Sequence, residues 1–253
     1  MLNRIKDSLR GFPIFYRAAQ RTYYFGLFAI ERLGFGGALH AWIWRTRAKE
    51  SFESLRQSAM HPHRELVIEA VRRIAPFGSL LEVGCHSGPN LVRLARAFPS
   101  ARFSGLDLNA GFIAQGRAWM REEGLGNVEL EVATAEALAE RASGSVDIVL
   151  VDAVLMYIGP ERIGDTLRHM RRIARRGVVI VDWMLGADDS RLHHWYDLHW
   201  VHNYPALLGK IAPECGVHAT RIPPEVWSGG GWGEYGTLLC IEIPRADAPP
   251  RTG

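Results

Sequence analysis

The sequence has little cysteine and no regular cysteine spacing. Its 253 residues contain three cysteines, Cys85, Cys215 and Cys240, with no CxxC pair and no Cys/His set spaced as metal ligands. An odd number of cysteines without such spacing argues against a disulfide framework and against a structural zinc site. We therefore expect a protein of a reducing compartment, the cytoplasm.

Long uncharged hydrophobic runs are also missing. Residues 1–10 carry charges throughout and lack the apolar core of a secretory signal. The most apolar stretch, residues 23–44, is interrupted by Glu31, Arg32 and His40, whereas a bilayer span needs about 20 nearly uncharged residues. The pattern predicts two short amphipathic helices joined at glycines, which form either a lid over the core or an element on a membrane surface.

Charge of one sign is not concentrated in the chain. The formal net charge is +3, and residues 168–176 are the one stretch that approaches a basic cluster. Nucleic-acid-binding proteins show clustered Lys and Arg, and this stretch is more typical of a solvated helix face. We expect no nucleic-acid partner, and the sequence leaves the oligomeric state open.

From about residue 62 onward, short apolar runs alternate with helical segments, which is typical of βαβ units and a parallel sheet. The predicted strands are residues 79–83, 102–106, 128–132, 146–151 and 178–181. The predicted helices are residues 65–74, 89–97, 110–123, 135–141, 160–175 and 205–212. Two more apolar runs, residues 218–222 and 237–243, predict a closing hairpin around the glycine-rich loop 229–233.

These elements predict a doubly wound α/β fold with a mostly parallel, seven-stranded, Rossmann-like sheet and an antiparallel C-terminal hairpin. Residues 1–60 are predicted to be a helical lid or extension, residues 61–245 the catalytic domain and residues 246–253 a flexible tail. Residues 186–204 show no clean period, so no element is predicted there.

The strongest local signal is a strand that runs into a glycine turn and then a helix, over residues 80–90. Gly84 and Gly88 allow the backbone to turn tightly and to approach a ligand closely. Glu82, at the strand end, is suited to the cationic amino group of a bound amino acid, and the helix start is suited to its carboxylate.

A second carboxylate, Asp107, ends the next strand nineteen residues after Gly88. A carboxylate at this position accepts hydrogen bonds from ribose hydroxyls in nucleotide-binding βαβ units, including those that bind NAD. The glycine spacing does not supply the G-x-G-x-x-G pattern of a dinucleotide site, which argues against NAD.

With these motifs the sequence resembles the small-molecule-type branch of the class I S-adenosylmethionine-dependent methyltransferases. Residues 132–138 look like the adenine-binding segment of that family, and residues 146–158 are similar to its fourth-strand motif. The resemblance implies S-adenosylmethionine as cofactor and a small-molecule acceptor, or one linked to a lipid or glycan. The cofactor-binding residues that it implies are Glu82, Gly84, Cys85, His86, Gly88, Asp107, Leu108, Thr134, Ala135 and Asp152.

Two residues depart from the pattern of the family. His86 stands where a small residue is usual, so its ring either contacts the methionine part of the cofactor or shrinks the pocket. Thr134 replaces an adenine-contacting Asp, although a hydroxyl still accepts a hydrogen bond. These departures keep open an alternative function, that of a non-catalytic cofactor-binding or scaffold protein.

Methyl transfer is an in-line displacement, so the protein must align the acceptor and exclude water. A hydroxyl or protonated amine also needs a base. The predicted catalytic residues are Asp152, Tyr157, His199 and His202, the last two from a His/Trp-rich segment that also contains His193 and His194. The structural alternatives are a turn cap for Asp152, a core position for Tyr157 and a packed loop for the histidines.

A metal site is not expected. Magnesium-dependent catechol-type enzymes place an Asp after the fourth strand and an Asp-Asn pair after the fifth. Asp152 and Asp182 are present, but Trp183 stands where the Asn belongs. The chain also lacks the Asx-Pro-Pro-Tyr/Phe segment of amino-methylating nucleic-acid enzymes.

Overall fold

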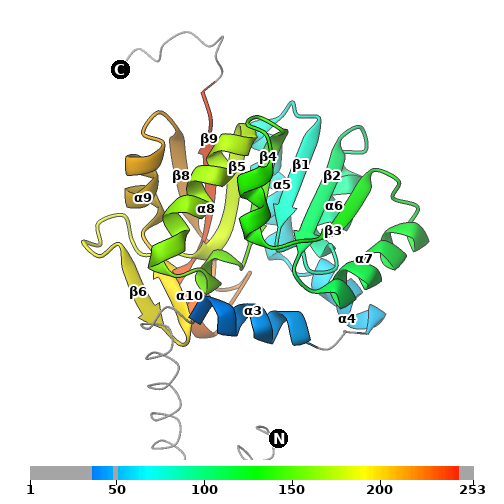
Figure 1. The fold of residues 1–253 in the computed structure, drawn as a ribbon, viewed down its shortest axis with the longest axis horizontal. Helices are drawn as coiled ribbons and strands as arrows, with labels where there is room; N and C mark the ends of the chain where they lie inside the picture. Colours follow the sequence, from blue (N-terminus) through cyan, green and yellow to red (C-terminus); the bar gives the residue numbers. More distant parts are fainter. Residues whose placement is uncertain (1–35, 48–50, 245–253) are drawn as a thin grey trace, which may run out of the picture.

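The computed structural model describes residues 36–47 and 51–244, and its centre is a seven-stranded sheet of order β3-β2-β1-β4-β5-β9-β8 (Figure 1). The five parallel strands are β1 (Ser79–Val83), β2 (Arg102–Asp107), β3 (Val128–Val132), β4 (Val146–Asp152) and β5 (Ala174–Trp183). β9 (Gly236–Glu242) pairs antiparallel with both β5 and β8 (Gly216–Arg221). The predicted fold class and closing hairpin are confirmed.

Helices cover both faces of this sheet. On one face the core contains buried side chains of α4 (Phe52–Ala59), α5 (His63–Ile74), α6 (Pro89–Ala97) and α7 (Ala110–Glu122). On the other face it contains those of the 3-10 helix η1 (Ala135–Glu140), α8 (Pro160–Ile173) and α9 (Tyr204–Ile211). Because both faces are covered, the strands are continuously apolar instead of alternating, which is why β4 stands out in the sequence.

Alternate residues of β4 point to the two cores. Ile148 and Leu150 pack on the face of α5, and Val149 and Val151 pack on the face of α8. All four are fully buried, and each such side chain contributes about 1.5–3 kcal/mol by leaving water. Packing from both sides fixes the strand and therefore the position of Asp152 at its end.

Three predicted segments differ from the structure. The helix predicted over residues 160–175 ends at Ile173, and β5 begins at the next residue. The glycine-rich loop between β8 and β9 contains a short helix, α10 (Gly230–Tyr235). Its Trp232 stacks on Trp227 with ring centroids 3.6 Å apart, so these aromatic rings order a segment that glycine composition alone predicts to be a loop.

The third difference is a small two-stranded sheet where no element was predicted. β6 (His193–Tyr196) pairs antiparallel with β7 (His199–His202). The two residues between them, Asp197 and Leu198, have φ of 44° and 68°. Positive φ at both central residues is the requirement of a type I′ hairpin turn, which usually takes Asn and Gly.

α3 (Gly36–Thr46) lies across the edge of the sheet at which the parallel strands end (Figure 1). The first helix predicted in the N-terminal segment and the tail 246–253 lie outside the described residues, and the domain division at residue 60 stays a prediction. None of the helices in the described part of the chain is long and apolar enough to cross a membrane.

Candidate active site

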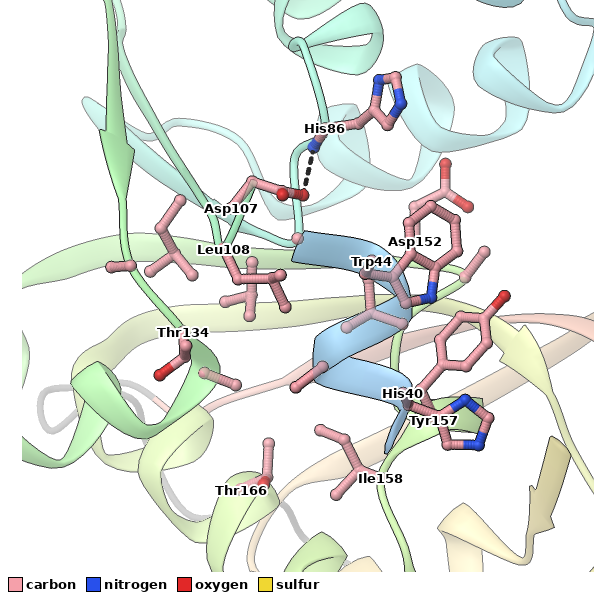
Figure 2. A pocket seen from close by; sticks show the side chains of 18 of the residues that line it. His40, Trp44, His86, Asp107, Leu108, Thr134, Asp152, Tyr157, Ile158 and Thr166 are labelled. Carbon is pink, nitrogen blue, oxygen red and sulfur yellow. Dashed lines mark hydrogen bonds between the residues drawn. The ribbon is translucent and has the colours of Figure 1, made fainter. Parts of the chain in front are cut away.

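A cavity of about 700 Å³ opens at the carboxyl ends of the parallel strands, beneath α3 (Figure 2). Its floor is formed by the segments that follow β1, β2, β3 and β4, and its further walls by α3, α8, the start of α5 and Trp227. Open α/β sheets bind ligands at this edge, so the cavity is the candidate site.

The predicted ribose carboxylate lies on the cavity wall. Asp107 Oδ2 accepts a hydrogen bond from the backbone N–H of His86 at 2.9 Å, and Oδ1 accepts one from the N–H of Asn109 at 2.8 Å. Burial raises the pKa of Asp107, although these two hydrogen bonds oppose the shift. Gly84, with φ +72°, and Leu108 line the cavity beside it. The structure therefore brings Gly84, Asp107 and Leu108 together as predicted.

Thr134 and Ala135 also line the cavity, at the start of η1. Figure 2 shows Thr134 on the same side as Leu108 and away from Asp152. The predicted adenine-side residues thus lie beyond the ribose carboxylate, in the order that an extended nucleoside requires.

His86 adopts a left-handed backbone conformation with φ 54°. Its ring stacks on Phe112 with centroids 3.7 Å apart, and Figure 2 shows it turned away from Leu108 and Thr134. The backbone conformation that glycine adopts freely is kept here at a cost of about 1–2 kcal/mol. The residue lines the cavity, but its ring does not close it.

A buried polar network begins at Asp152, at the end of β4. Its Oδ2 accepts hydrogen bonds from His63 Nε2 and from Asn90 Nδ2, each at 2.9 Å. Arg64 donates to Asn90 Oδ1 at 2.6 Å, and its NH1 atom lies 3.5 Å from Asp152 Oδ2. Asn90 Nδ2 also lies 2.7 Å from Glu82 Oε1, so Glu82 joins the network from β1.

The two carboxyl groups of the network differ in charge. Burial, reinforced by the charge of Asp152, raises the pKa of Glu82 to about 8. Burial also opposes the charge of Asp152, but His63 and Arg64 outweigh it and hold the pKa of Asp152 below its usual range. At neutral pH Asp152 therefore carries the negative charge and Glu82 the proton.

The three remaining predicted catalytic residues lie at different depths. Tyr157 lines the cavity, and burial raises its pKa to about 12. His199 packs behind it, with ring centroids 5.0 Å apart. His202 is fully buried, with its Nε2 2.9 Å from the carbonyl oxygen of Ile158 and its Nδ1 2.8 Å from Nδ1 of His193. His199 and His202 are not among the described residues that line the cavity, so the structure places them as supports of the Tyr157 wall.

Some predicted cofactor residues also lie behind the cavity surface. Glu82, Cys85 and Gly88 are absent from the lining among the described residues. Cys85 is buried, and a Cβ on Gly88 would meet the Met120 side chain at 2.6 Å. These residues shape the turn beneath the cavity.

Asp182 has no free oxygen for a metal ion. Its Oδ2 accepts from the backbone N–H groups of Leu155 and Met156 at 2.8 and 3.3 Å, and its Oδ1 accepts from that of Trp183 at 2.7 Å. Within residues 36–47 and 51–244, no three His, Cys, Asp or Glu side chains are grouped to hold a metal.

Comparison with known proteins agrees with this geometry. Residues 80–177 match the family described as "Methyltransferase domain". The magnesium protoporphyrin IX methyltransferase of Synechocystis PCC 6803, solved with bound S-adenosylmethionine, is 14% identical with a TM-score of 0.54 over 82% of this chain and 91% of that one. The chain therefore has the fold of the class I methyltransferases, and residues 80–177 are similar to that domain family. A geranyl diphosphate methyltransferase, solved with its diphosphate and sinefungin, is 16% identical with a TM-score of 0.56 over 71% and 76% of the two chains.

A curated relative is similar in sequence to part of this chain. The trans-aconitate 2-methyltransferase of Deinococcus radiodurans is 26% identical over 124 residues, which are 48% of this chain and 44% of that protein. The match thus spans less than half of the relative.

Sequence reasoning missed many residues that line the cavity, among them His40, His61, His63, Arg64 and Trp227. Asp152 and His63 are 89 residues apart in the chain, so no local motif connects them. The nearest signal in the sequence was the position of His63 and Arg64 directly before the amphipathic helix predicted over residues 65–74.

The pKa of Glu82 predicts a pH dependence of stability. Between its unfolded pKa near 4.5 and its folded pKa of about 8, the folded protein binds a proton that the unfolded chain does not. This contribution to the free energy of unfolding is complete below the unfolded value and is lost, by about 1.4 kcal/mol per pH unit, as pH rises toward 8. Glu82→Gln removes this loss. Denaturant titrations of both proteins from about pH 5 to 8 measure the difference in the free energy of unfolding. If this free energy depends on pH in the same way in both proteins, the raised pKa of Glu82 is refuted.

The hydrogen bonds of Asn109 predict that this residue links α3 to the loop that carries Asp107. Its Nδ2 donates to the carbonyl oxygens of Trp44 and Arg47 at 2.8 and 3.1 Å, and its Oδ1 caps α7 by accepting from Gly111 and Phe112. Asn109→Asp keeps the cap but sets a carboxylate oxygen against two carbonyls. We expect faster amide hydrogen exchange across α3 with α7 unchanged, whereas Asn109→Ala, the matched control, also weakens α7. Unchanged exchange in α3 for Asn109→Asp would contradict the link.

Proposed function

We propose that the chain is an S-adenosylmethionine-dependent methyltransferase that acts on a small-molecule acceptor. The observation that carries the proposal is Asp107, a carboxylate on the cavity wall at the end of β2, between the Gly84 turn and Thr134. A nucleoside laid along this edge has its ribose hydroxyls at Asp107 and its base at Thr134 and Ala135.

The polar network supports a cationic amino acid at the other end of the nucleoside. Two buried carboxyl oxygens, Glu82 Oε2 and Asp152 Oδ1, have no hydrogen-bond partner. An unsatisfied buried oxygen costs about 1–3 kcal/mol, and an ammonium group near Asp152 would repay part of this cost. Asp152 lines the cavity, so the residues present fit the methionine part of the cofactor.

The cofactor supplies a methyl group on a sulfonium, and the chain supplies alignment and a dry site. α3 places His40 and Trp44 over the cavity, where both pack against Tyr157 with ring centroids 5.3 and 5.4 Å away. Tyr157 keeps its proton at neutral pH because burial raises its pKa to about 12, so its hydroxyl is a hydrogen-bond donor that orients the acceptor.

Aromatic rings dominate the wall on the acceptor side. His40, Trp44, Tyr157 and Trp227 come from three separate segments and line the cavity near Asp152. Such a wall favours a flat or apolar acceptor body over a highly charged one. The relatives named above act on chemically different acceptors, which fits a common cofactor site with variable walls.

Replacement of Asp107 tests cofactor binding. Asp107→Ala removes an acceptor of ribose hydroxyls, and each such charge-assisted bond contributes about 1.5–3 kcal/mol, so we expect S-adenosylhomocysteine to bind at least about 10-fold more weakly by calorimetry. Asp107→Asn keeps the shape of the side chain and an oxygen for one of the two N–H groups, that of His86 or that of Asn109, so it disturbs the loop less than Asp107→Ala does. Glu129→Ala changes an exposed carboxylate outside the cavity as the control. If Asp107→Ala and the parent protein bind S-adenosylhomocysteine with equal affinity, the proposal is wrong.

Turnover separates an enzyme from a scaffold. We expect the full chain with methyl-labelled S-adenosylmethionine to transfer label to at least one member of a panel of phenols, alcohols, carboxylates and amines, with release of S-adenosylhomocysteine. Mass spectrometry of the products gives the acceptor atom. Tight cofactor binding with no product from any class would favour the non-catalytic alternative.

A further inference from the structure

Two histidines run from the cavity wall to the buried carboxylate of Asp152. His61 lines the cavity, and its Nδ1 lies 2.6 Å from Nδ1 of His63. Nε2 of His63 lies 2.9 Å from Asp152 Oδ2. We propose that this His61–His63–Asp152 relay is the general base of methyl transfer and that the acceptor atom is a hydroxyl oxygen, an inference that rests on the proposed function.

The hydrogen-bond pattern fixes where the protons lie. Asp152 Oδ2 also accepts from Asn90 Nδ2, so the ionised carboxylate is an acceptor and His63 must carry a proton on Nε2. A neutral His63 then presents a lone pair at Nδ1. Two nitrogens 2.6 Å apart share one proton, so in the neutral pair that proton is on Nδ1 of His61, with the backbone N–H of His63 at a longer 3.4 Å from the same atom. His61 Nε2 is left with a lone pair, which is the form of imidazole that accepts a proton.

The same contacts suit the relay after it has taken up a proton. When His61 Nε2 gains a proton, Nδ1 passes its own to His63, which becomes an imidazolium paired with Asp152. Nδ1 of His61 is then an acceptor, and the backbone N–H of His63 already lies 3.4 Å from it. The charge is thus held on a side chain that is 3% exposed beside a carboxylate, instead of at the cavity surface.

Other cavity groups are less suited to act as the base. Asp152 Oδ2 is occupied, and His63 and Arg64 hold the pKa of Asp152 low. Burial raises the pKa of Tyr157 to about 12 and lowers that of His40 to about 4, so the first keeps its proton and the second is a weak base. His169 lies on α8 near Thr166, which Figure 2 shows across the cavity from Asp152.

The charged groups that face His61 favour a neutral acceptor. Burial, followed by His63 and Arg64, lowers the pKa of His61, and Asp152 opposes this shift. The segment packed on the other side presents the indole of Trp227, with ring centroids 4.9 Å from His61 and 4.3 Å from His63. A cationic amine would face Arg64 and the sulfonium, whereas a hydroxyl brings no charge.

The reaction balances with these residues alone. The acceptor O–H bond breaks and its proton goes to Nε2 of His61, while the oxygen lone pair forms the new O–C bond. The C–S bond breaks and its electron pair stays on sulfur, which becomes a neutral thioether. The proton held on His63 returns through His61 to water after the methyl ether leaves.

Imidazole NMR of the full chain tests the relay directly. With ¹⁵N-labelled histidine and saturating S-adenosylhomocysteine, we expect His61 to carry its proton on Nδ1 above the titration of the pair. As pH falls, we expect His61 to switch from the Nδ1–H form to the Nε2–H form. His61→Gln, His63→Gln and the exposed His218→Gln assign the signals. A His61 that carries its proton on Nε2 throughout, or that titrates independently of His63, would overturn the relay.

The carboxylate is tested by a positioning variant. Asp152→Asn removes the charge that stabilises the imidazolium, so His61 should switch between its two forms at a pH at least about one unit lower. The NMR spectrum should otherwise remain that of the folded protein. An unshifted titration would refute the role of Asp152.

Kinetic measurements test the role of His61 independently, with the acceptor identified in the panel of phenols, alcohols, carboxylates and amines. We expect His61→Gln to lower kcat about 100-fold or more and to abolish the lower limb of the pH–rate profile, with the affinity for S-adenosylhomocysteine unchanged. His218→Gln should leave kcat as in the parent. A carboxylate or amine acceptor, or an unchanged kcat in His61→Gln, would overturn the inference while the proposed function stands. Failure of the parent protein to bind S-adenosylmethionine or S-adenosylhomocysteine would instead refute the proposed function.

Discussion

The carboxylate of Asp152 is the charge on which the rest of the site depends. It is 8% exposed at the end of a strand packed on both sides, so it must be paired to remain ionised. Its partners come from α5 and α6, which attach these helices to the end of β4 through His63, Arg64 and Asn90. Burial, reinforced by the charge of Asp152, makes the neighbouring carboxyl, Glu82, keep its proton. The helices α5 and α6 and the end of β4 are therefore joined in one hydrogen-bonded unit. In the proposed function, a ligand ammonium is the partner of its remaining oxygen at the cavity, Asp152 Oδ1.

A second unit connects the cofactor side to the lid. Asp107 accepts from the N–H of Asn109, and Asn109 caps α7 with its oxygen while its amide nitrogen holds two carbonyls at the end of α3. One side chain, 3% exposed, thus connects three elements. Because α3 carries Trp44 and His40 over the cavity, the position of the lid depends on the loop that presents the ribose carboxylate. The loop of Asp107 and α3 are consequently coupled through few atoms.

The parallel strands and the glycine turn are predictable from sequence because local pattern determines them. Buried strands are continuously apolar, and the turn at Gly84 needs the positive φ that glycine adopts freely. The β6–β7 hairpin escapes prediction because Asp197 and Leu198 take positive φ without the usual Asn-Gly pair. His63 escapes because its partner is 89 residues away, and a histidine at a helix start has no pattern until the strand end is placed beside it. The aromatic segment alone predicted His199 and His202 as catalytic residues, whereas neither is among the described residues that line the cavity, and His202 is fully buried.

The cavity wall that contains Tyr157 is supported from behind by two buried titratable side chains, Asp182 and His202. Tyr157 and Ile158 lie at the 3-10 helix η2 (Leu155–Tyr157), whose first N–H groups are bound by Asp182 and whose end is contacted by His202. Burial raises the pKa of Asp182 to about 7 and lowers that of His202 to about 3, so His202 is neutral and Asp182 is only partly ionised at neutral pH. Tyr157 is thereby fixed against the lid residues that contact it. Trp44 and Trp227 come instead from a helix and a loop outside this buried support. Changes in these two residues would therefore reshape this wall of the cavity while the strand ends, Asp107 and the Asp152 network stay in place.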